Sequence, residues 1–444
     1  MTKDAATITT SAASLRSRLQ SGIAWNLLGA VFNQGSTFAV NIIVANILGQ
    51  KVFGEYAMLQ STILTLTNIA QFAAGYTANK YVAEFRSTDK EKAGRILGLC
   101  SAVSATMACI VALFLLVSAP WLASEILQAP HLSNSLRIAT GVVLFAVMNL
   151  YQMGALAGLE SYRTLAQAGI ASGCLYLGIC SLAAWLWGLK GAIAGLMVTA
   201  LLQWLILNQF LRKESAKQGI NINYQGFWQE RAIIWRFALP AALPGFTSTP
   251  AIWLANAFLV RQPSGYTQIA LYSAANNLRV LILFLPNIIN NVGMSLLNQQ
   301  KGLGHERRYR KIFWANLAAV GGCLLVIAIV ISLIGRWILS LFGENFQAGY
   351  PILLILMIAT VAEGLSIALY SIIQTQEKMW LSLFAIALPR DMMIVAFSYW
   401  MTSKYQAVGL AWAYATTWII ILLNTIVLIS FIGLRLKSQK HSTP

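Results

Sequence analysis

Apolar residues in this chain gather into runs of about 20, separated by short polar segments. A helix of that length crosses the hydrocarbon core of a bilayer. A transmembrane β-barrel would instead show short segments of alternating polarity. We therefore expect an all-α polytopic membrane protein with about twelve transmembrane helices. They lie near residues 22–48, 53–80, 94–118, 132–157, 163–187, 190–211, 232–260, 267–297, 312–335, 350–374, 378–401 and 405–433.

The composition agrees with this pattern. Of 444 residues, 58% are hydrophobic and only 10% are charged, and the mean hydropathy is +0.66. A soluble protein of ordinary composition carries about 25% charged residues. The five cysteines and three histidines show no metal-ligand spacing, so we expect no metal and no cofactor.

The positive charges are distributed unevenly among the loops. Twenty-three of the 31 lysines and arginines fall in the terminal segments and in the alternate loops on the same side, and six fall in the opposite loops. This bias predicts that both termini are cytoplasmic, in a multi-pass protein of the bacterial cytoplasmic (inner) membrane. The net charge of +17 therefore reflects topology and contact with membrane lipids, and we expect no nucleic-acid partner. Residues 1–21 are polar and lack an apolar core, so we do not expect them to be a cleaved signal peptide.

Weak self-similarity relates the two halves of the chain. Ala45-Asn46 recurs as Ala255-Asn256 at an offset of 210, and Trp121 recurs as Trp337 at an offset of 216. An even number of helices in each half makes the two repeats parallel. We expect five parts: a cytoplasmic N-terminal segment (1–21), an N-lobe of six helices (22–211), a cytoplasmic linker (212–231), a C-lobe of six helices (232–433) and a cytoplasmic tail (434–444).

Polar residues form stripes on several expected helices. On the eighth helix, Arg279 shares an arc of about 120° with a set of asparagines. The first helix carries polar residues at four-residue spacing, and the second carries a weaker stripe. Such faces avoid lipid and meet protein or water. They predict either ordinary interhelical hydrogen bonds or a hydrated, substrate-binding cavity lined by Arg279, Asn276, Asn287, Asn290, Asn291, Asn33, Thr37, Asn41, Gln60, Thr67 and Gln71.

The seventh expected helix carries Pro240, Pro244 and Gly245. Proline removes a backbone donor and bends a helix, and transporters use such bends near substrate sites. We expect a hinge at these three residues.

Four charged residues lie inside expected membrane helices: Arg279, Glu363, Arg390 and Asp391. Charges at this depth are costly unless they are paired or face water. Glu363 and Arg390 are plausible mates, because they lie on consecutive helices. Arg279 could pair with Asp391 or bind an anionic ligand. Glu363, Arg390 and Asp391 could equally form a structural charge network or a site for ion coupling.

Several segments resemble a known family: GIAWNLLGAVFNQG, FGEYAMLQS, GYTANKYVAEFR, ALAGLESYR, IALYSAANNLRVLILFLPNIIN and YQAVGLAWAYATTWII. They resemble the polysaccharide-biosynthesis (O-antigen and exopolysaccharide) flippases, of the superfamily that also contains the multidrug antiporters of the MATE type. The resemblance implies two six-helix lobes, a central cavity and alternating access. It also implies a polyprenyl-pyrophosphate-linked oligosaccharide as substrate, and it leaves room for other polysaccharide-assembly proteins as partners. Because cavity cations bind the pyrophosphate in such proteins, Arg279 is the candidate here.

Two other functions fit the pattern less well. A cation-coupled multidrug antiporter of the same superfamily relies on a carboxylate in its first or seventh helix, and those helices carry none here. A membrane polymerase or ligase acting on the same lipids needs reactive groups on a sizeable outer loop. The outer segments are short and hold no acid/base pair or nucleophile constellation. We therefore expect a transporter and not an enzyme.

Overall fold

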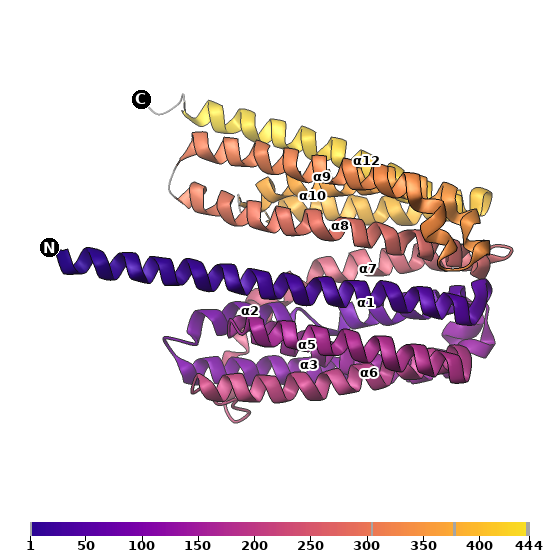
Figure 1. Ribbon diagram of the computed structural model, residues 1–444, viewed down its shortest axis with the longest axis horizontal. Helices are drawn as coiled ribbons and strands as arrows, with labels where there is room; N and C mark the ends of the chain where they lie inside the picture. The colour runs from indigo at the N-terminus through magenta and orange to yellow at the C-terminus, as the bar shows by residue number, and fades with distance from the viewer. Residues whose placement is uncertain (1, 303–304, 376–378, 441–444) are drawn as a thin grey trace. The chain divides into compact units, whose positions relative to one another are not determined.

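The computed structural model describes the backbone of residues 2–302, 305–375 and 379–440. It describes the side chains of residues 29–430 except 244, 301, 303–304, 306 and 371–380. Within these ranges every regular element is a helix, as Figure 1 shows. The α-helices are α1 (Thr2–Ala70), α2 (Ala74–Phe85), α3 (Lys90–Trp121), α4 (Ser133–Gly158), α5 (Tyr162–Leu175), α6 (Ser181–Lys217), α7 (Leu239–Val260), α8 (Gly265–Gly302), α9 (Glu306–Ser340), α10 (Tyr350–Thr375), α11 (Met379–Ser382) and α12 (Leu388–Lys440).

Short π-helical and 3₁₀ turns join or extend these helices. The π-helical turns are η1 (Leu122–Ile126), η3 (Tyr176–Cys180), η5 (Ile234–Ala238) and η7 (Leu383–Ala387). The 3₁₀ turns are η2 (Pro130–Leu132), η4 (Phe227–Glu230) and η6 (Glu344–Gly349).

Eight stretches of the described chain are long and apolar enough to cross a membrane. Three of them contain two helices joined at a kink, located at Gly49, at Trp187–Gly188 and at Gln406. With α7, the described residues therefore provide about twelve spans, which confirms the predicted all-α membrane fold. Gly49 has a φ of 75°, in the left-handed region that glycine enters without steric cost.

The expected helix over residues 53–80 is not continuous. It ends at Ala70, and α2 begins at Ala74. Between them Phe72 and Ala73 have φ angles of 44° and 53°. Neither proline nor glycine occupies 71–73, so the sequence carried no local signal for this break.

The chain forms two compact units. Unit 1 contains Met1–Ile47, Leu59–Glu125 and Ala129–Phe246, and unit 2 contains Leu48–Met58, Ile126–Gln128 and Thr247–Pro444. Unit 2 thus includes a short segment of the first half, and buried aromatic contacts explain why. The ring of Phe53 lies 6.1 Å from that of Phe342 and 5.7 Å from that of Phe346.

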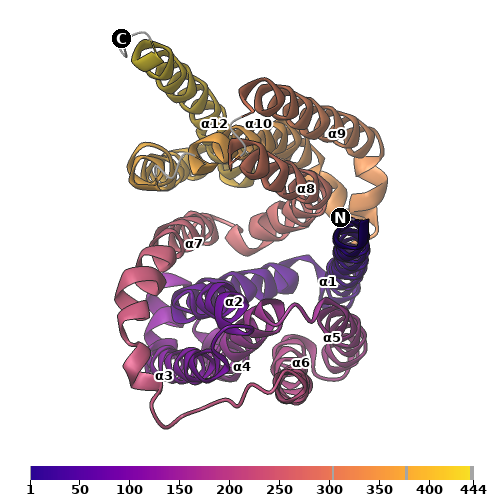
Figure 2. The ribbon, with the colours of Figure 1, turned by 90° about the vertical axis from the view of Figure 1, so that its left-hand side faces the viewer.

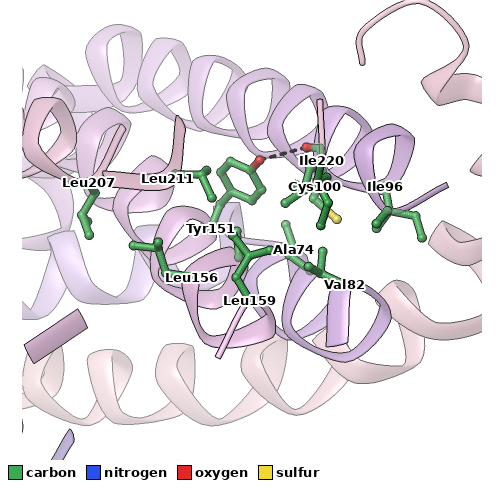
Figure 3. Close-up of a cluster of buried hydrophobic side chains, with 14 of the residues drawn as sticks. Ala74, Val82, Ile96, Cys100, Tyr151, Leu156, Leu159, Leu207, Leu211 and Ile220 are labelled. Carbon is green, nitrogen blue, oxygen red and sulfur yellow. Dashed lines mark hydrogen bonds between the residues drawn. The ribbon is translucent and has the colours of Figure 1, made fainter. Parts of the chain in front are cut away.

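The core of unit 1 lies among α2, α3, α4 and α6, and Figure 3 shows its centre. Tyr151 on α4 is 3% exposed, and its hydroxyl donates to the carbonyl of Leu97 on α3 at 2.9 Å. Leu207 and Leu211 enter the same cluster from α6, and Ile220 enters it from the segment that follows α6. This core therefore extends into the expected linker.

The segment after α6 is docked along α3. The expected linker 212–231 begins inside α6, which continues to Lys217. The amide of Asn223 then donates to the carbonyl of Gly94 at 3.1 Å. A Cβ atom on Gly94 would lie 2.1 Å from the carbonyl oxygen of Asn221, and one on Gly98 would lie 2.1 Å from that of Asn223. The two glycines on α3 leave room for this extended backbone.

In unit 2, α10 packs against α8, α9 and α12 (Figure 2). A buried amide pair joins α8 to α9, because Asn316 donates to the side-chain oxygen of Asn290 at 3.1 Å. The central place of α10 lets a single side chain on it reach both α8 and α12. Glu363 occupies such a position and is 8% exposed.

Candidate functional site

Arg279 forms the centre of a buried polar cluster in unit 2. One turn of α8 separates it from Asn276, whose side-chain oxygen accepts from Arg279 Nε at 2.7 Å. Arg279 Nη1 forms an ion pair with Glu363 on α10. The same nitrogen donates to the hydroxyl of Tyr414 on α12 at 2.7 Å, and this hydroxyl donates to Glu363 at 3.1 Å. Three helices therefore meet around one guanidinium.

The cluster leaves part of the guanidinium available. The side chains of Arg279 and Glu363 are each 11% exposed, so their charges are largely removed from water and compensate each other. A guanidinium has five N–H donors. The contacts above use the donors of Nε and Nη1, and Nη2 has no hydrogen-bond partner among the described residues. Two donors of Arg279 thus have no partner in the described part of the chain.

A second cluster involves Arg390 and Asp391 on α12. Arg390 Nε and Nη2 lie 2.8 Å and 2.7 Å from the same carboxylate oxygen of Asp391. Ser248 on α7 bridges the pair, because its hydroxyl accepts from Arg390 Nη2 and donates to Asp391 at 3.0 Å. The guanidinium carbon of Arg390 lies 5.5 Å from the ring centroid of Trp418.

Both pairings expected from the sequence are wrong. Glu363 pairs with Arg279 instead of Arg390, and Asp391 pairs with Arg390 instead of Arg279. Adjacent residues on a helix point about 100° apart, but the long arginine side chain reaches back to the neighbouring carboxylate. Each of these carboxylates is therefore paired with an arginine side chain. The described residues contain no group of three or more potential metal-ligating side chains.

Two aromatic residues connect the clusters. Tyr414 and Trp418 are four residues apart on α12, and their ring centroids lie 6.2 Å apart at an interplanar angle of 61°. Sequence reasoning missed Tyr414, Trp418 and Ser248, because aromatic and hydroxyl residues within apolar helices give no signal of charge. The four-residue spacing of Tyr414 and Trp418 was the one available hint.

The asparagines of α8 have different environments. Asn276 contacts Arg279, and Asn290 is buried against Asn316. Asn287 and Asn291 are exposed on the surface of the described chain. The residues of the stripe therefore differ in role. Asn276 contacts Arg279, Asn290 joins α8 to α9, and Asn287 and Asn291 are exposed.

The polar residues of the first two expected helices lie in unit 1. Asn33 is exposed, and Asn41 and Thr67 are buried with side-chain oxygens that lack a partner in the described chain. Thr37 donates to the carbonyl of Asn33 and Gln71 donates to Asn68, each at 2.9 Å and within one helical turn. Gln60 donates to the hydroxyl of Tyr176, on the distant turn η3, at 3.3 Å.

The proposed hinge residues lie at the boundary between the units. Pro240 is exposed at the start of α7, and the side chain of Pro244 lies outside the described residues. A Cβ atom on Gly245 would lie 3.7 Å from the carbonyl oxygen of Asn68. Unit 1 ends at Phe246, one residue after Gly245. A hinge at this point stays a prediction.

Residues 19–294 match the model of a family described as polysaccharide biosynthesis protein. The chain belongs to this family. It is 25% identical over 385 residues to the EPS I polysaccharide export inner membrane protein EpsE of Ralstonia nicotianae (strain ATCC BAA-1114 / GMI1000), which covers 83% of this chain and 84% of that protein. The corresponding protein of Ralstonia solanacearum is 23% identical over 377 residues, with the same two coverages.

Solved structures share the fold at low identity. An inward-facing multidrug resistance MATE family transporter of the MOP superfamily superposes with a TM-score of 0.73 and 14% identity, covering 94% of this chain and 100% of that one. The lipid II flippase MurJ, in an inward closed conformation, superposes with a TM-score of 0.74 and 11% identity, covering 90% and 86%. The protein is thus a multi-pass membrane protein of the polysaccharide biosynthesis protein family, with the fold of these solved structures.

Proposed function

We propose that the protein is a flippase that moves a polyprenyl-pyrophosphate-linked oligosaccharide from the cytoplasmic to the outer leaflet of the inner membrane. Membership of the polysaccharide biosynthesis family supports the substrate class and a transport role over an enzymatic one. The observation that carries the proposal is Arg279, a buried guanidinium with two donors left over.

The chemistry of Arg279 suits a pyrophosphate. A planar guanidinium binds phosphate oxygens through paired N–H groups, and it stays charged at any physiological pH. Glu363 already neutralises its charge. An arriving anion must therefore compete with a carboxylate, which keeps binding weak enough for release on the other side of the membrane.

The remaining sequence expectations complete the proposed cycle. The two halves alternate access by rocking, the hinge lies at Pro240, Pro244 and Gly245, and both termini are cytoplasmic. The exposed polar side chains of Asn33, Asn287 and Asn291 contact the sugars, whose hydroxyl groups need amide partners.

The decisive experiment is flipping of a fluorescent polyprenyl-pyrophosphate oligosaccharide in proteoliposomes. We expect Arg279→Ala to reduce flipping by at least about tenfold, because a charge-assisted hydrogen bond to the phosphate is lost. Arg336→Ala is the matched control, since Arg336 is exposed on α9 and lies over Tyr350, outside the cluster. Equal flipping by wild type and Arg279→Ala would remove Arg279 from the mechanism. No flipping by wild type, together with efflux of organic cations, would refute the flippase.

A further inference from the structure

A continuous series of contacts runs from Arg279 to α7. The guanidinium carbon of Arg279 lies 4.7 Å from the ring centroid of Tyr414. Tyr414 contacts Trp418, and Arg390 lies over the ring of Trp418. Arg390 then donates to Ser248 on α7. Each member of this series lies in unit 2, so the series is a property of one compact body.

The series ends at Ser248, three residues after Gly245 of the proposed hinge. Unit 2 resumes at Thr247, and Ser248 is the next residue. Ser248 both accepts from Arg390 and donates to Asp391, so its position depends on the geometry of that ion pair. A displacement of Arg390 would therefore move Ser248, which lies in the first turn of α7 that belongs to unit 2.

The hydrogen bonding of the Trp418 indole explains why this series of contacts can adopt two conformations. The indole is 7% exposed and lies beside the Tyr414 hydroxyl, but its Nε1 makes no hydrogen bond of normal geometry within the described side chains and backbone. A buried donor without a partner is unfavourable and favours any rearrangement that supplies an acceptor. Tyr414 can become that acceptor, because its hydroxyl oxygen now accepts from Arg279 and would be released if Arg279 turned to another anion.

We propose that Trp418 and Ser248 are positioning residues that couple anion binding at Arg279 to α7. The inference rests on the proposed function, because it assumes that a pyrophosphate binds at Arg279. The anion takes Arg279 away from the Tyr414 hydroxyl, and the indole N–H of Trp418 donates to the freed oxygen. The shifted indole moves Arg390, and Ser248 transmits the change to α7. Binding of the pyrophosphate group, whatever sugar it carries, thereby changes the conformation of α7 next to the proposed hinge.

The test uses inorganic pyrophosphate as the probe and the full-length protein in nanodiscs. Calorimetry measures pyrophosphate affinity, and hydrogen exchange measures the response of residues 247–256. The variants are Trp418→Phe, which keeps a ring but removes the N–H, and Ser248→Ala. Trp412→Phe is the matched control, because Trp412 lies on the same helix and is 41% exposed. Ser248→Thr, which keeps the hydroxyl, should rescue the response.

We expect pyrophosphate to change exchange in α7 by about fivefold or more in wild type and in Trp412→Phe, as allosteric couplings commonly do. Trp418→Phe and Ser248→Ala should bind pyrophosphate but lose this change. A wild-type response in these two variants would overturn the coupling and leave the flippase intact. If wild type and Arg279→Ala show the same affinity, the anion site itself is wrong, and the coupling fails with it.

Discussion

Arg279 contacts Tyr414 in two ways at once. Its Nη1 donates to the tyrosine hydroxyl at 2.7 Å, and its guanidinium carbon lies 4.7 Å from the ring centroid. A cation over an aromatic face is stabilised by the ring quadrupole, and this interaction is stronger where water is excluded. Tyr414 thus fixes the plane of the guanidinium. That plane determines the direction in which the two donors of Nη2 point.

Arg279→Lys separates charge from geometry. Lysine can keep the ion pair with Glu363, but it lacks the planar fork that serves Asn276, Tyr414 and a ligand together. We expect the protein to fold with a nearly unchanged Tm and to flip lipid at least about tenfold more slowly. Proteoliposome flipping and thermal unfolding in detergent measure the two properties. A lysine variant with wild-type flipping would show that charge alone is sufficient.

The ion pair between Arg279 and Glu363 predicts that mutations of the two residues have non-additive effects on stability. Glu363→Leu leaves the charge of Arg279 buried without its carboxylate, which should destabilise the protein by about 3–5 kcal/mol. Arg279→Met combined with Glu363→Leu removes both charges and should recover most of the stability. Thermal unfolding of the two single variants and the double variant gives the cycle. Flipping should stay absent in the double variant, and recovery of flipping there would contradict a direct role for Arg279.

The sequence predicted the fold far better than the contacts within it. Apolar runs of the right length predicted the membrane-spanning helices, because the bilayer imposes that length on every span. Arg279 was also recognised, because a charge inside such a run is conspicuous. Its pairing with Glu363 and Tyr414 was not, since that depends on how α8, α10 and α12 are rotated against one another. The periodicity of a single helix carries no information about that rotation.

Backbone breaks were the second limit. Gly49 and Gly188 mark two kinks with a residue that tolerates positive φ, but Gln406, Phe72 and Ala73 adopt such angles without that signal. Such angles persist at residues other than glycine only where the surrounding structure holds them. Phe72, for example, lies 6.1 Å from the ring of Phe246.

Two asparagines on α8 should behave differently when truncated. Asn290→Ala removes the acceptor of a buried amide pair and leaves Asn316 unsatisfied, so we expect a loss of about 1–3 kcal/mol in stability. Asn287→Ala changes an exposed side chain and should leave stability within about 0.5 kcal/mol. If Asn287 contacts the sugars, its variant alone should slow flipping per folded molecule. Equal flipping by Asn287→Ala and wild type would exclude it from the substrate path.

The docked segment after α6 gives a prediction about glycine. Gly98→Ala places a Cβ atom 2.1 Å from the carbonyl oxygen of Asn223, so the segment must lift away from α3. Gly322→Ala on α9 meets nothing within 4 Å and is the matched control. Alanine there should stabilise the helix by about 0.5–1 kcal/mol. Limited trypsin digestion in nanodiscs should cut Gly98→Ala at Lys217 and Arg231 several times faster than wild type. Unchanged cleavage would mean that the segment tolerates the added methyl group and that its backbone is not held against Gly98.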